Sequence, residues 1–512
     1  MTSQVNNQRI AKNTLLLYGR MLLIMAVSLY TSRVVLNTLG VEDYGIYNVV
    51  GGIVTMFAFL NGAMVTSTQR YLTFELGKED NERLRVTFST SIQIHAILSL
   101  IIVILSETIG LWFFYHKMII PEARMTAAMW VFQLSIVTMV IQVMSAPYNA
   151  IIIAHEEMNV FAIISIVEAI LKLAIVYVLL IGKFDKLILY AILVAAVQLF
   201  IRVLYTSYCK KHYPESKLVK GFDNGLVKER GAFAGWNIWG NLAATFFGTG
   251  LNLLLNMFFG PIVNAARAVS VQVESAIGMF SNNFLMAVNP QITKQYAQNS
   301  IQEMHRLLFR ASKFSFFLVY ILALPVFLET EQILTVWLKT VPDYTVQFLR
   351  VLLFIVVIDT TAKPLMTAAA ATGDVKKYQT IIGGILLAIV PIAYIVLKLG
   401  GNPTSVYIVH LSICIIAFAT RLLIIRPMID LSLKDYSSSV LIRCFLVAFF
   451  SFGLSLLIQL VLPRGIVYSL LTCIVSVIIT AFFILALGCS RGERAFLAKK
   501  AQSFANQIRH HD

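Results

Sequence analysis

Long apolar stretches recur along the whole chain, and they constrain its fold more than any other feature. Each is about 20 residues long or longer, the length that a helix needs to cross about 30 Å of hydrocarbon. Of the 512 residues only 13% are charged, and the mean hydropathy is +0.79. A soluble protein of this size needs more polar surface than that. We therefore expect an all-α protein that crosses a membrane many times.

The sequence contains fourteen such stretches, separated by short polar links that mostly carry Gly, Pro, Asn or Asp. The predicted helices cover residues 13–38, 45–70, 86–112, 125–152, 158–181, 187–209, 232–256, 261–289, 307–328, 344–371, 376–397, 404–426, 437–461 and 466–488. The longest link follows the sixth helix and divides the chain. The predicted parts are an N-terminal lobe of helices 1–6 (1–209), a cytoplasmic inter-lobe link (210–231), a C-terminal lobe of helices 7–12 (232–430), helices 13 and 14 (431–489) and a cytoplasmic tail (490–512).

The placement of lysine and arginine predicts how these helices are oriented. With the N-terminus in the cytoplasm, the inner links and tails carry 26 basic residues and the outer links carry seven. Basic residues concentrate on the cytoplasmic side of membrane proteins, so we expect both termini to be cytoplasmic. The net charge of +15 then reflects topology, and it does not indicate a nucleic-acid partner.

The two halves of the chain also resemble each other. The stretch "LNTLGVEDYGIYNVVGGI" aligns with "LNMFFGPIVNAARAVSVQ", which places Gly40 on Gly260. Further along, "SAPYNAIIIAHEEMNVFAI" aligns with "TAKPLMTAAAATGDVKKYQTI" and places Pro147 on Pro364. Each half contains six helices, so the repeat is parallel, about an axis along the membrane normal. Because proline permits a helix to bend, we expect Pro147 and Pro364 to act as hinges.

The basic residues at the inner ends of the predicted helices, Arg70, Arg310, Lys313, Lys376, Lys377, Arg421 and Arg426, are counted with the inner links. Twelve further charged residues fall inside the predicted helices, where each costs about 2.5–3.5 kcal/mol near the bilayer centre. The basic ones are Arg20, Arg33, Lys172, Arg202, Arg267, Arg350, Lys363 and Arg443, and the acidic ones are Glu107, Glu168, Glu274 and Asp359. Two acid–base pairs have i,i+4 spacing, Glu168 with Lys172 and Asp359 with Lys363, and we expect each to pair along its helix. A paired charge in mid-membrane still favours a wet or protein-lined site.

Arg267 and Glu274 lie seven residues apart on one face of the eighth helix, about 10 Å apart along its axis and too far for an easy direct pair. Small and polar residues share that face, and similar stripes run along the second and seventh helices. Such stripes can simply hold helices together. Combined with the charges, they favour a hydrated cavity between the lobes. Two six-helix lobes around a central polar cavity indicate an alternating-access transporter.

Four stretches give the sequence a family resemblance: "LGVEDYGIYNVV", "STQRYLTFELG", "APYNAIIIAHEEMNV" and "NPQITKQYA". They resemble the bacterial polysaccharide flippases of the multidrug/oligosaccharidyl-lipid/polysaccharide exporter superfamily, and the resemblance covers nearly the whole chain. It implies an inner-membrane protein that moves undecaprenyl-pyrophosphate-linked sugar repeat units to the periplasmic leaflet, for O-antigen, capsule or a related glycan. Membrane lipid, a polysaccharide polymerase and other export machinery are the implied partners.

The related peptidoglycan-precursor flippases use arginines of helices 1, 2 and 8 in a cationic cavity. Arg33 and Arg267 lie on helices 1 and 8 here, whereas the only basic residue of helix 2, Arg70, lies at its cytoplasmic end. Arginine binds phosphate oxygens bidentately, and amide groups can bind sugar hydroxyls. The predicted substrate-binding residues are therefore Arg267, Arg33, Arg350, Asn237, Asn241, Asn252, Gln272 and Asn282.

The energy source is less defined by the sequence. The Gly-Lys dipeptides lack the spacing of a P-loop, so ATP is not the expected driver. We expect no organic cofactor, but a coupling H⁺ or Na⁺ remains open. The residues predicted for ion coupling or charge balance are Glu274, Asp359, Lys363, Glu168 and Lys172. The five cysteines show no C-x-x-C spacing and predict no metal site.

Two other functional classes are open. A cation-coupled multidrug or organic-cation exporter of the same fold would need acidic residues in its cavity, whereas the predicted helices carry more basic residues than acidic ones. A membrane enzyme such as a glycan polymerase would need a large outer loop with catalytic residues, and the outer links have about 15 residues or fewer. We therefore expect a transporter and not an enzyme.

The predicted topology can be tested by labelling single introduced cysteines in intact cells. Residue 220 in the inter-lobe link and the C-terminal tail should be protected from an impermeant reagent. A cysteine in the 329–343 link should react, because that link is expected outside. Labelling of residue 220 from outside would refute the predicted orientation.

Overall fold

The computed structural model describes residues 2–57, 81–155, 157–181, 184–217, 219, 246–372 and 376–495, together with scattered positions between 61 and 76. Within these residues the chain is helical and contains no strand. This confirms the predicted all-α class. A helix satisfies every backbone hydrogen bond within itself, which is why helices span hydrocarbon. Below, "outer" and "inner" ends of helices follow the predicted orientation.

The helices of the N-terminal half are long, as the apolar stretches predicted. They are α1 (Thr2–Leu39), α2 (Val41–Thr55), α4 (Asn81–Leu105), the π-helix Ser106–Gly110, α5 (Leu111–Lys117), α6 (Met125–Ala154), α7 (Met158–Ile181) and α8 (Lys186–His212), with single 3₁₀ turns at Glu122–Arg124 and Pro214–Ser216.

The C-terminal half begins, within the described residues, with the helix Phe246–Phe259. The helices that follow are α10 (Pro261–Ala297), α11 (Ile301–Leu328), α12 (Thr330–Leu338), α13 (Thr345–Ala371), α14 (Lys376–Leu387), α15 (Ile389–Lys398), α16 (Pro403–Met428), α17 (Leu433–Tyr436), α18 (Ile442–Val461) and α19 (Ile466–Phe483), with π-helices at Ser437–Leu441 and Ile484–Gly488.

Within the described residues, eleven helical segments are long and apolar enough to cross a membrane, by length and composition. Each corresponds to one of the fourteen predicted stretches. The stretches 45–70 and 232–256 lie partly outside the described residues. The stretch 261–289 forms the polar helix α10. The count of fourteen therefore stays a prediction, whereas a multi-span helical membrane protein is what the structure describes.

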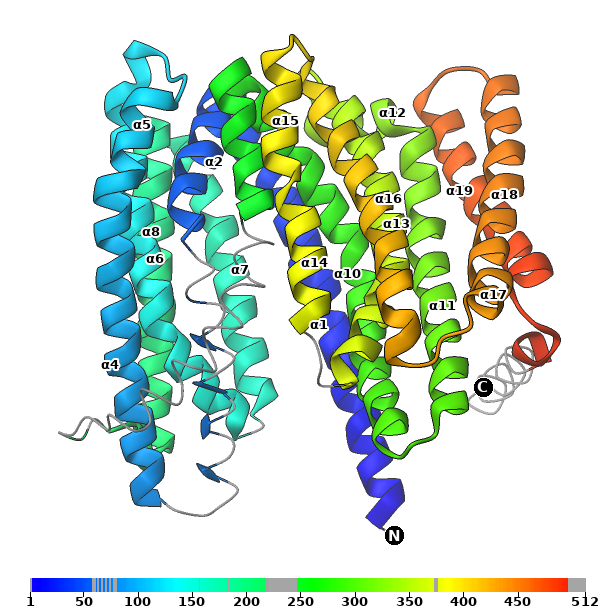
Figure 1. Ribbon diagram of the computed structural model, residues 1–512. Coiled ribbons are helices and arrows are strands. Elements are labelled where there is room, and N and C mark those ends of the chain that lie inside the picture. Colours follow the sequence, from blue (N-terminus) through cyan, green and yellow to red (C-terminus); the bar gives the residue numbers. More distant parts are fainter. Residues whose placement is uncertain are drawn as a thin grey trace, which may run out of the picture. The chain divides into compact units, whose positions relative to one another are not determined.

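The chain forms two compact units. The first unit contains Met1–Val269, Leu338–Thr345 and Leu386–Val406, and the second contains Ser270–Trp337, Val346–Ile385 and Tyr407–Asp512. In the first unit α6 packs against α2, α4 and α8, and α1 packs against α7. The row of α4, α6 and α8 is visible in Figure 1. The predicted lobe boundary at 210–231 lies mostly outside the described residues and remains a prediction.

The two glycines that the repeat aligns adopt the same conformation. Gly40 separates α1 from α2 with φ +82°, and Gly260 separates the helix Phe246–Phe259 from α10 with φ +79°. Each glycine N–H donates to the carbonyl four residues earlier, over 2.9 Å in both cases. A left-handed backbone costs an L-residue about 1–2 kcal/mol, whereas glycine adopts it freely. The same sharp helix–helix corner therefore occurs at matching places in both halves.

Below the first corner, α2 makes close backbone approaches through glycine. A Cβ on Gly45 would lie 1.9 Å from the Pro261 carbonyl oxygen, and one on Gly52 would lie 2.9 Å from Nδ2 of Asn252. Without side chains at these positions, α2 sits directly on the start of α10 and on the preceding helix. Small residues allow such close helix packing in membranes, where the hydrophobic effect gives little drive.

An ion-pair network joins three helix starts at the outer end of the first unit. Arg124 contacts Asp43 of α2 and Asp185, which precedes α8, with N–O distances of 2.6 Å to each. Asp185 also caps α8 by accepting from the N–H groups of Leu187 and Ile188. The hydrogen bond from Arg124 lowers the pKa of Asp185. The Asp43 side chain is less exposed than that of Asp185. Burial therefore raises the pKa of Asp43, although Asp43 pairs with the same arginine.

In the second unit, α18 and α19 form a hairpin that packs against α11 (Figure 1). Small hydroxyl residues fill the inner faces of the hairpin: Ser451, Ser455, Thr472, Ser476 and Thr480, all buried. A buried carboxylate, Glu329, accepts from Gln459 and Ser469 at the outer end. At the inner end Lys313 of α11 pairs with Glu493 over 2.7 Å. This hairpin is therefore tied to α11 at both ends.

The predicted hinge prolines lie inside unbroken helices, Pro147 in α6 and Pro364 in α13. The span 376–398 is interrupted instead, since α14 ends at Leu387 and α15 starts at Ile389. Pro391 explains this interruption, because it has no N–H to donate to the Leu387 carbonyl. A hinge role for Pro147 and Pro364 stays a prediction.

The glycine contact between α2 and α10 gives a stability prediction. Gly45→Ala should lower the apparent melting temperature and the yield of monodisperse protein, because overpacking against a backbone carbonyl costs about 1–3 kcal/mol or more. Gly51→Ala is the matched control, since its Cβ would meet its nearest neighbour, Ser135 Oγ, at an ordinary 3.7 Å. Equal melting temperatures for the two variants would contradict the close approach.

Candidate functional site

Arg267 lies on α10 within the first unit and is half-buried. It is six residues after Pro261, which places it about 9 Å along the helix from the outer end. Its guanidinium donates through Nη2 to the carbonyl oxygen of Gly248, on the neighbouring helix. The side chain is thereby held within the protein and does not extend to the helix end.

Arg33 lies equally far from the outer end of its own helix, α1. It is six residues before Leu39, the last residue of α1, and is also half-buried in the first unit. The structure describes no hydrogen bond or ion pair of its guanidinium. The first unit therefore holds two arginines about 9 Å below the outer ends of α1 and α10.

The asparagines of the seventh helix connect helices to one another. Nδ2 of Asn252 donates to the Asn48 carbonyl of α2 over 3.2 Å. Nδ2 of Asn264 on α10 donates to the backbone and side-chain oxygens of Asn252 over 2.7 and 2.8 Å. Asn256 exchanges hydrogen bonds with the backbone of Ile119. The contacts of these asparagines therefore show side chains that hold helices together, which is the simpler role that a stripe of polar residues can have.

Asn237 and Asn241, two more predicted sugar ligands, lie outside the described residues. Gln272 and Glu274 are half-buried on the part of α10 that belongs to the second unit. Arg350 is exposed near the start of α13, and its guanidinium carbon lies 5.7 Å from the centre of the Phe327 ring. An arginine on an aromatic face near a helix end is well placed to extend toward the membrane surface.

In the second unit four polar side chains from three helices come together. We call them the inner cluster: Asn282 of α10, Asp359 and Lys363 of α13, and Arg421 of α16. Lys363 Nζ donates to Asn282 Oδ1 over 2.8 Å. Arg421 Nη1 lies 3.5 Å from Asp359 Oδ1. Lys363 and Arg421 are eight and seven residues from the inner ends of their helices, about 10–12 Å.

The predicted pair between Asp359 and Lys363 is therefore wrong. Both side chains share a helix face, but each finds its partner on a neighbouring helix, Arg421 for Asp359 and Asn282 for Lys363. An i,i+4 pair contributes only about 0.2–0.5 kcal/mol. Contacts between helices readily outweigh it.

Arg421 is the site residue that the sequence reasoning missed. It was counted with the inner link 421–436, whereas α16 continues to Met428. Its residue exposure is only 6%, and its Nε is buried without a hydrogen-bond partner. The signal was available, because apolar residues flank Arg421 on both sides in "AFATRLLII".

The other predicted i,i+4 pair is confirmed. Lys172 Nζ lies 2.6 Å from Glu168 Oε1 on α7. Gln198 of α8 donates to the same carboxylate oxygen over 2.8 Å. This pair in the first unit is partly exposed, with 27% of the Glu168 side chain and 43% of the Lys172 side chain accessible.

Comparison with known proteins addresses the fold. No protein-family model matches the sequence, and no curated protein matches it either. A lipid II flippase, MurJ, in an inward closed conformation has a TM-score of 0.68 at 12% identity, over 92% of this chain and 97% of that one. A multidrug-resistance MATE family transporter of the MOP superfamily has a TM-score of 0.60 inward-facing, at 15% identity over 79% and 96%. An outward-facing structure of a MATE family transporter gives 0.54 at 15% identity, over 81% and 95%.

At such low identities the likeness establishes the fold alone. The neighbours are a lipid II flippase and multidrug-resistance transporters of the MOP superfamily. The fold that the resemblance implied is thus confirmed. The roles of individual site residues are not tested by it.

The inner cluster makes a prediction about its ion pair. Asp359→Asn should lower the melting temperature, because it leaves the buried Arg421 without a counter-charge. In a double-mutant cycle, Asp359→Asn and Arg421→Gln should show a coupling of about 0.5–3 kcal/mol. The cycle of Asp359→Asn with Lys363→Gln is the control and should show less. A larger coupling to Lys363 would restore the i,i+4 pair and refute the geometry.

Proposed function

We propose that this protein is an alternating-access transporter that flips undecaprenyl-pyrophosphate-linked oligosaccharide repeat units from the cytoplasmic to the periplasmic leaflet for surface polysaccharide synthesis. The observation that carries the proposal is the inner cluster, which contains two basic side chains and one acidic side chain. Solved proteins of the same fold in both inward-facing and outward-facing conformations support the alternating-access part.

A pyrophosphate group fits the charge of the inner cluster. Lys363 and Arg421 supply two cations against the single carboxylate of Asp359, so the cluster carries an excess positive charge within the membrane-spanning region. Attraction between opposite charges is stronger there than in water. A guanidinium can hold phosphate oxygens bidentately, and the buried Nε of Arg421 has a donor to spare. An anionic substrate would compensate the excess positive charge of the inner cluster.

Arg33 and Arg267, near the outer ends of their helices, provide a second phosphate-binding position on the proposed path. Arg33 and Arg267 lie at equal depth near the outer ends of their helices. In the proposed orientation, cations would lie near the outer ends of helices in the first unit and near the inner ends of helices in the second, which suits movement of a pyrophosphate between leaflets. Asn282 and Gln272 are the described amides that would bind sugar hydroxyls, and Asn237 and Asn241 remain proposed ligands.

For coupling, the proposal offers three carboxylates, Asp359, Glu274 and Glu168. Asp359 and Glu168 lie within helices that are long and apolar enough to cross a membrane, and Glu274 lies on α10. Binding a proton or Na⁺ would offset the cost of such a charge inside the membrane. The protein would reside in the bacterial inner membrane with both termini in the cytoplasm. A polysaccharide polymerase on the periplasmic side would consume the flipped product.

The same fold also occurs in multidrug transporters, so organic-cation export is the alternative. The excess of basic residues at the proposed site favours an anionic substrate. Rescue of drug sensitivity, without rescue of glycan export, would favour the alternative.

Substitution of Arg267 tests the proposal in a flippase-deficient strain. Arg267→Ala should abolish glycan export, because the phosphate-binding cation near the outer end of α10 is lost. Arg267→Lys should retain part of the activity, since it keeps the charge but lacks the bidentate fork. Export is measured per molecule of protein in the membrane, and Arg464→Ala, in an exposed outer link, is the matched control.

If Arg267 serves only to hold α10 through the Gly248 carbonyl, Arg267→Ala would reduce the amount of folded protein. Export per molecule would then equal that of the wild type. That outcome would remove Arg267 from the transport mechanism.

A further inference from the structure

Glu107 is an intramembrane acid that the proposed transport path does not use. It lies within the helical span Asn81–Lys117, ten residues before the outer end, which is about 15 Å along the helix. A carboxylate at such a depth is costly and by default marks a functional site. The partner of its carboxylate is an amide and not a cation: Gln133 of α6 donates to Glu107 Oε2 over 3.3 Å. No ion pair of Glu107 occurs within the described residues.

The backbone around Glu107 is unusual. Residues Ser106–Gly110 form a π-helical turn between α4 and α5. Such turns are rare, occur mainly as single insertions and are frequent at functional sites. Gly110 in this turn packs closely against Ile53 and Phe132, where an added Cβ would meet carbon atoms at 3.3 Å. The π-turn therefore has a fixed position in the core of the first unit, and Glu107 is held on it next to α6.

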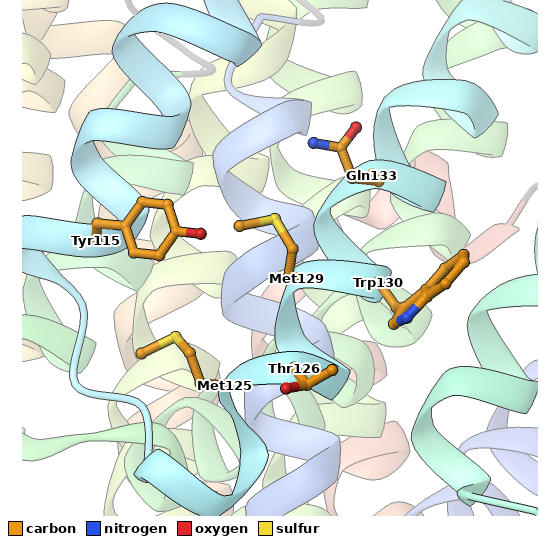
Figure 2. Close-up of a pocket in the computed structure, with 6 residues that line it drawn as sticks. All are labelled: Tyr115, Met125, Thr126, Met129, Trp130 and Gln133. Atoms are coloured by element: carbon orange, nitrogen blue, oxygen red, sulfur yellow. The ribbon is translucent and has the colours of Figure 1, made fainter.

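Gln133 is also part of the wall of a pocket between α5 and α6, entirely within the first unit. The pocket has a volume of about 360 Å³ and is lined by Tyr115, Met125, Thr126, Met129, Trp130 and Gln133. Figure 2 shows the Tyr115 hydroxyl and the two methionine side chains on its α5 side, with the Gln133 amide above them. Tyr115 and Trp130 are about half exposed, so the pocket opens at the protein surface.

The lining selects a chemical class of ligand. Aromatic rings attract cations over their faces, and thioethers adapt to irregular apolar groups. The lining contains no basic residue, and the Glu107 carboxylate lies one hydrogen bond behind Gln133. Among the described residues no three His, Cys, Asp or Glu side chains gather as metal ligands. A hydrated metal ion would therefore not find enough charged ligands here, whereas an organic cation would.

We propose that this pocket binds a lipophilic organic cation, a quaternary or protonated amine or its phosphonium equivalent, from the outer side. The ligand's apolar groups contact Tyr115, Met129 and Trp130, and its positive charge lies toward Gln133 and Glu107. None of these residues belongs to the proposed path of the lipid-linked oligosaccharide, so the two proposals can fail independently.

The experiment measures binding of radiolabelled tetraphenylphosphonium to the full-length protein in neutral maltoside micelles by equilibrium dialysis. This probe carries a permanent charge, so protonation of the ligand does not affect the result. Tetraphenylborate has the same shape and the opposite charge, and it should not compete. We expect saturable binding of one tetraphenylphosphonium per protein.

Two variants test the residues. Glu107→Gln should weaken binding about tenfold or more, because it removes the acidic charge that lies one hydrogen bond from Gln133. Trp130→Leu should weaken it about three- to tenfold through the lost cation–π contact. Glu82→Gln is the matched control, an exposed acid in the first turn of α4 at the opposite end of the same span. The melting temperature and elution profile of each variant establish that it is folded.

Three results would overturn the proposal. Unchanged binding by a folded Glu107→Gln variant would place the probe elsewhere or leave Glu107 as a merely protonated acid. Equal competition by tetraphenylborate would mean an apolar groove without charge preference. Displacement of the probe by an equimolar amount of diheptanoyl phosphatidylethanolamine would assign the pocket to a lipid headgroup.

Discussion

A peptide group or a charge without a partner is costly in hydrocarbon, and the whole architecture satisfies that constraint. Helices satisfy the peptide groups along each span. Where a span must end, a specific device takes over: a left-handed glycine at Gly40 and Gly260, or the side chain of Asp185 at the start of α8. The charged side chains are subject to the same constraint, and they are therefore the most informative residues in the protein.

Within each unit, association of the helices depends on small and polar residues more than on apolar ones. Lipid is as apolar as leucine, so apolar side chains give helices little reason to associate. Gly45 lets α2 approach the α10 backbone, and Asn252 and Asn264 then tie the same helices together by hydrogen bonds. The buried hydroxyls between α11, α18 and α19 have the corresponding role in the second unit. The large apolar side chains on the outer faces, such as Phe445 and Leu457, remain exposed to lipid.

The intramembrane charges fall into groups with different degrees of compensation. Glu168 is compensated by Lys172 and Gln198, which leaves that pair neutral. The inner cluster has one more basic residue than acidic ones, and Glu107 has an amide and no cation as its described partner. The first imbalance suits an anionic substrate and the second a cationic ligand. Because the two sites require ligands of opposite charge and lie in separate parts of the chain, we assign a different ligand to each.

The sequence by itself determined the all-α class, the eleven spans that the structure describes and the local pair on α7. Those features depend on hydropathy and on the spacing of residues along one helix, which a sequence displays directly. Even the corner glycines were found this way, because the two halves carry the same local requirement at Gly40 and Gly260. Only the tertiary structure decided that Asp359 pairs with Arg421, that Asn252 joins helices, and that Gln133 of α6 meets Glu107. Each depends on which helices become neighbours and how each is rotated about its axis, and no periodicity within a single helix contains that information.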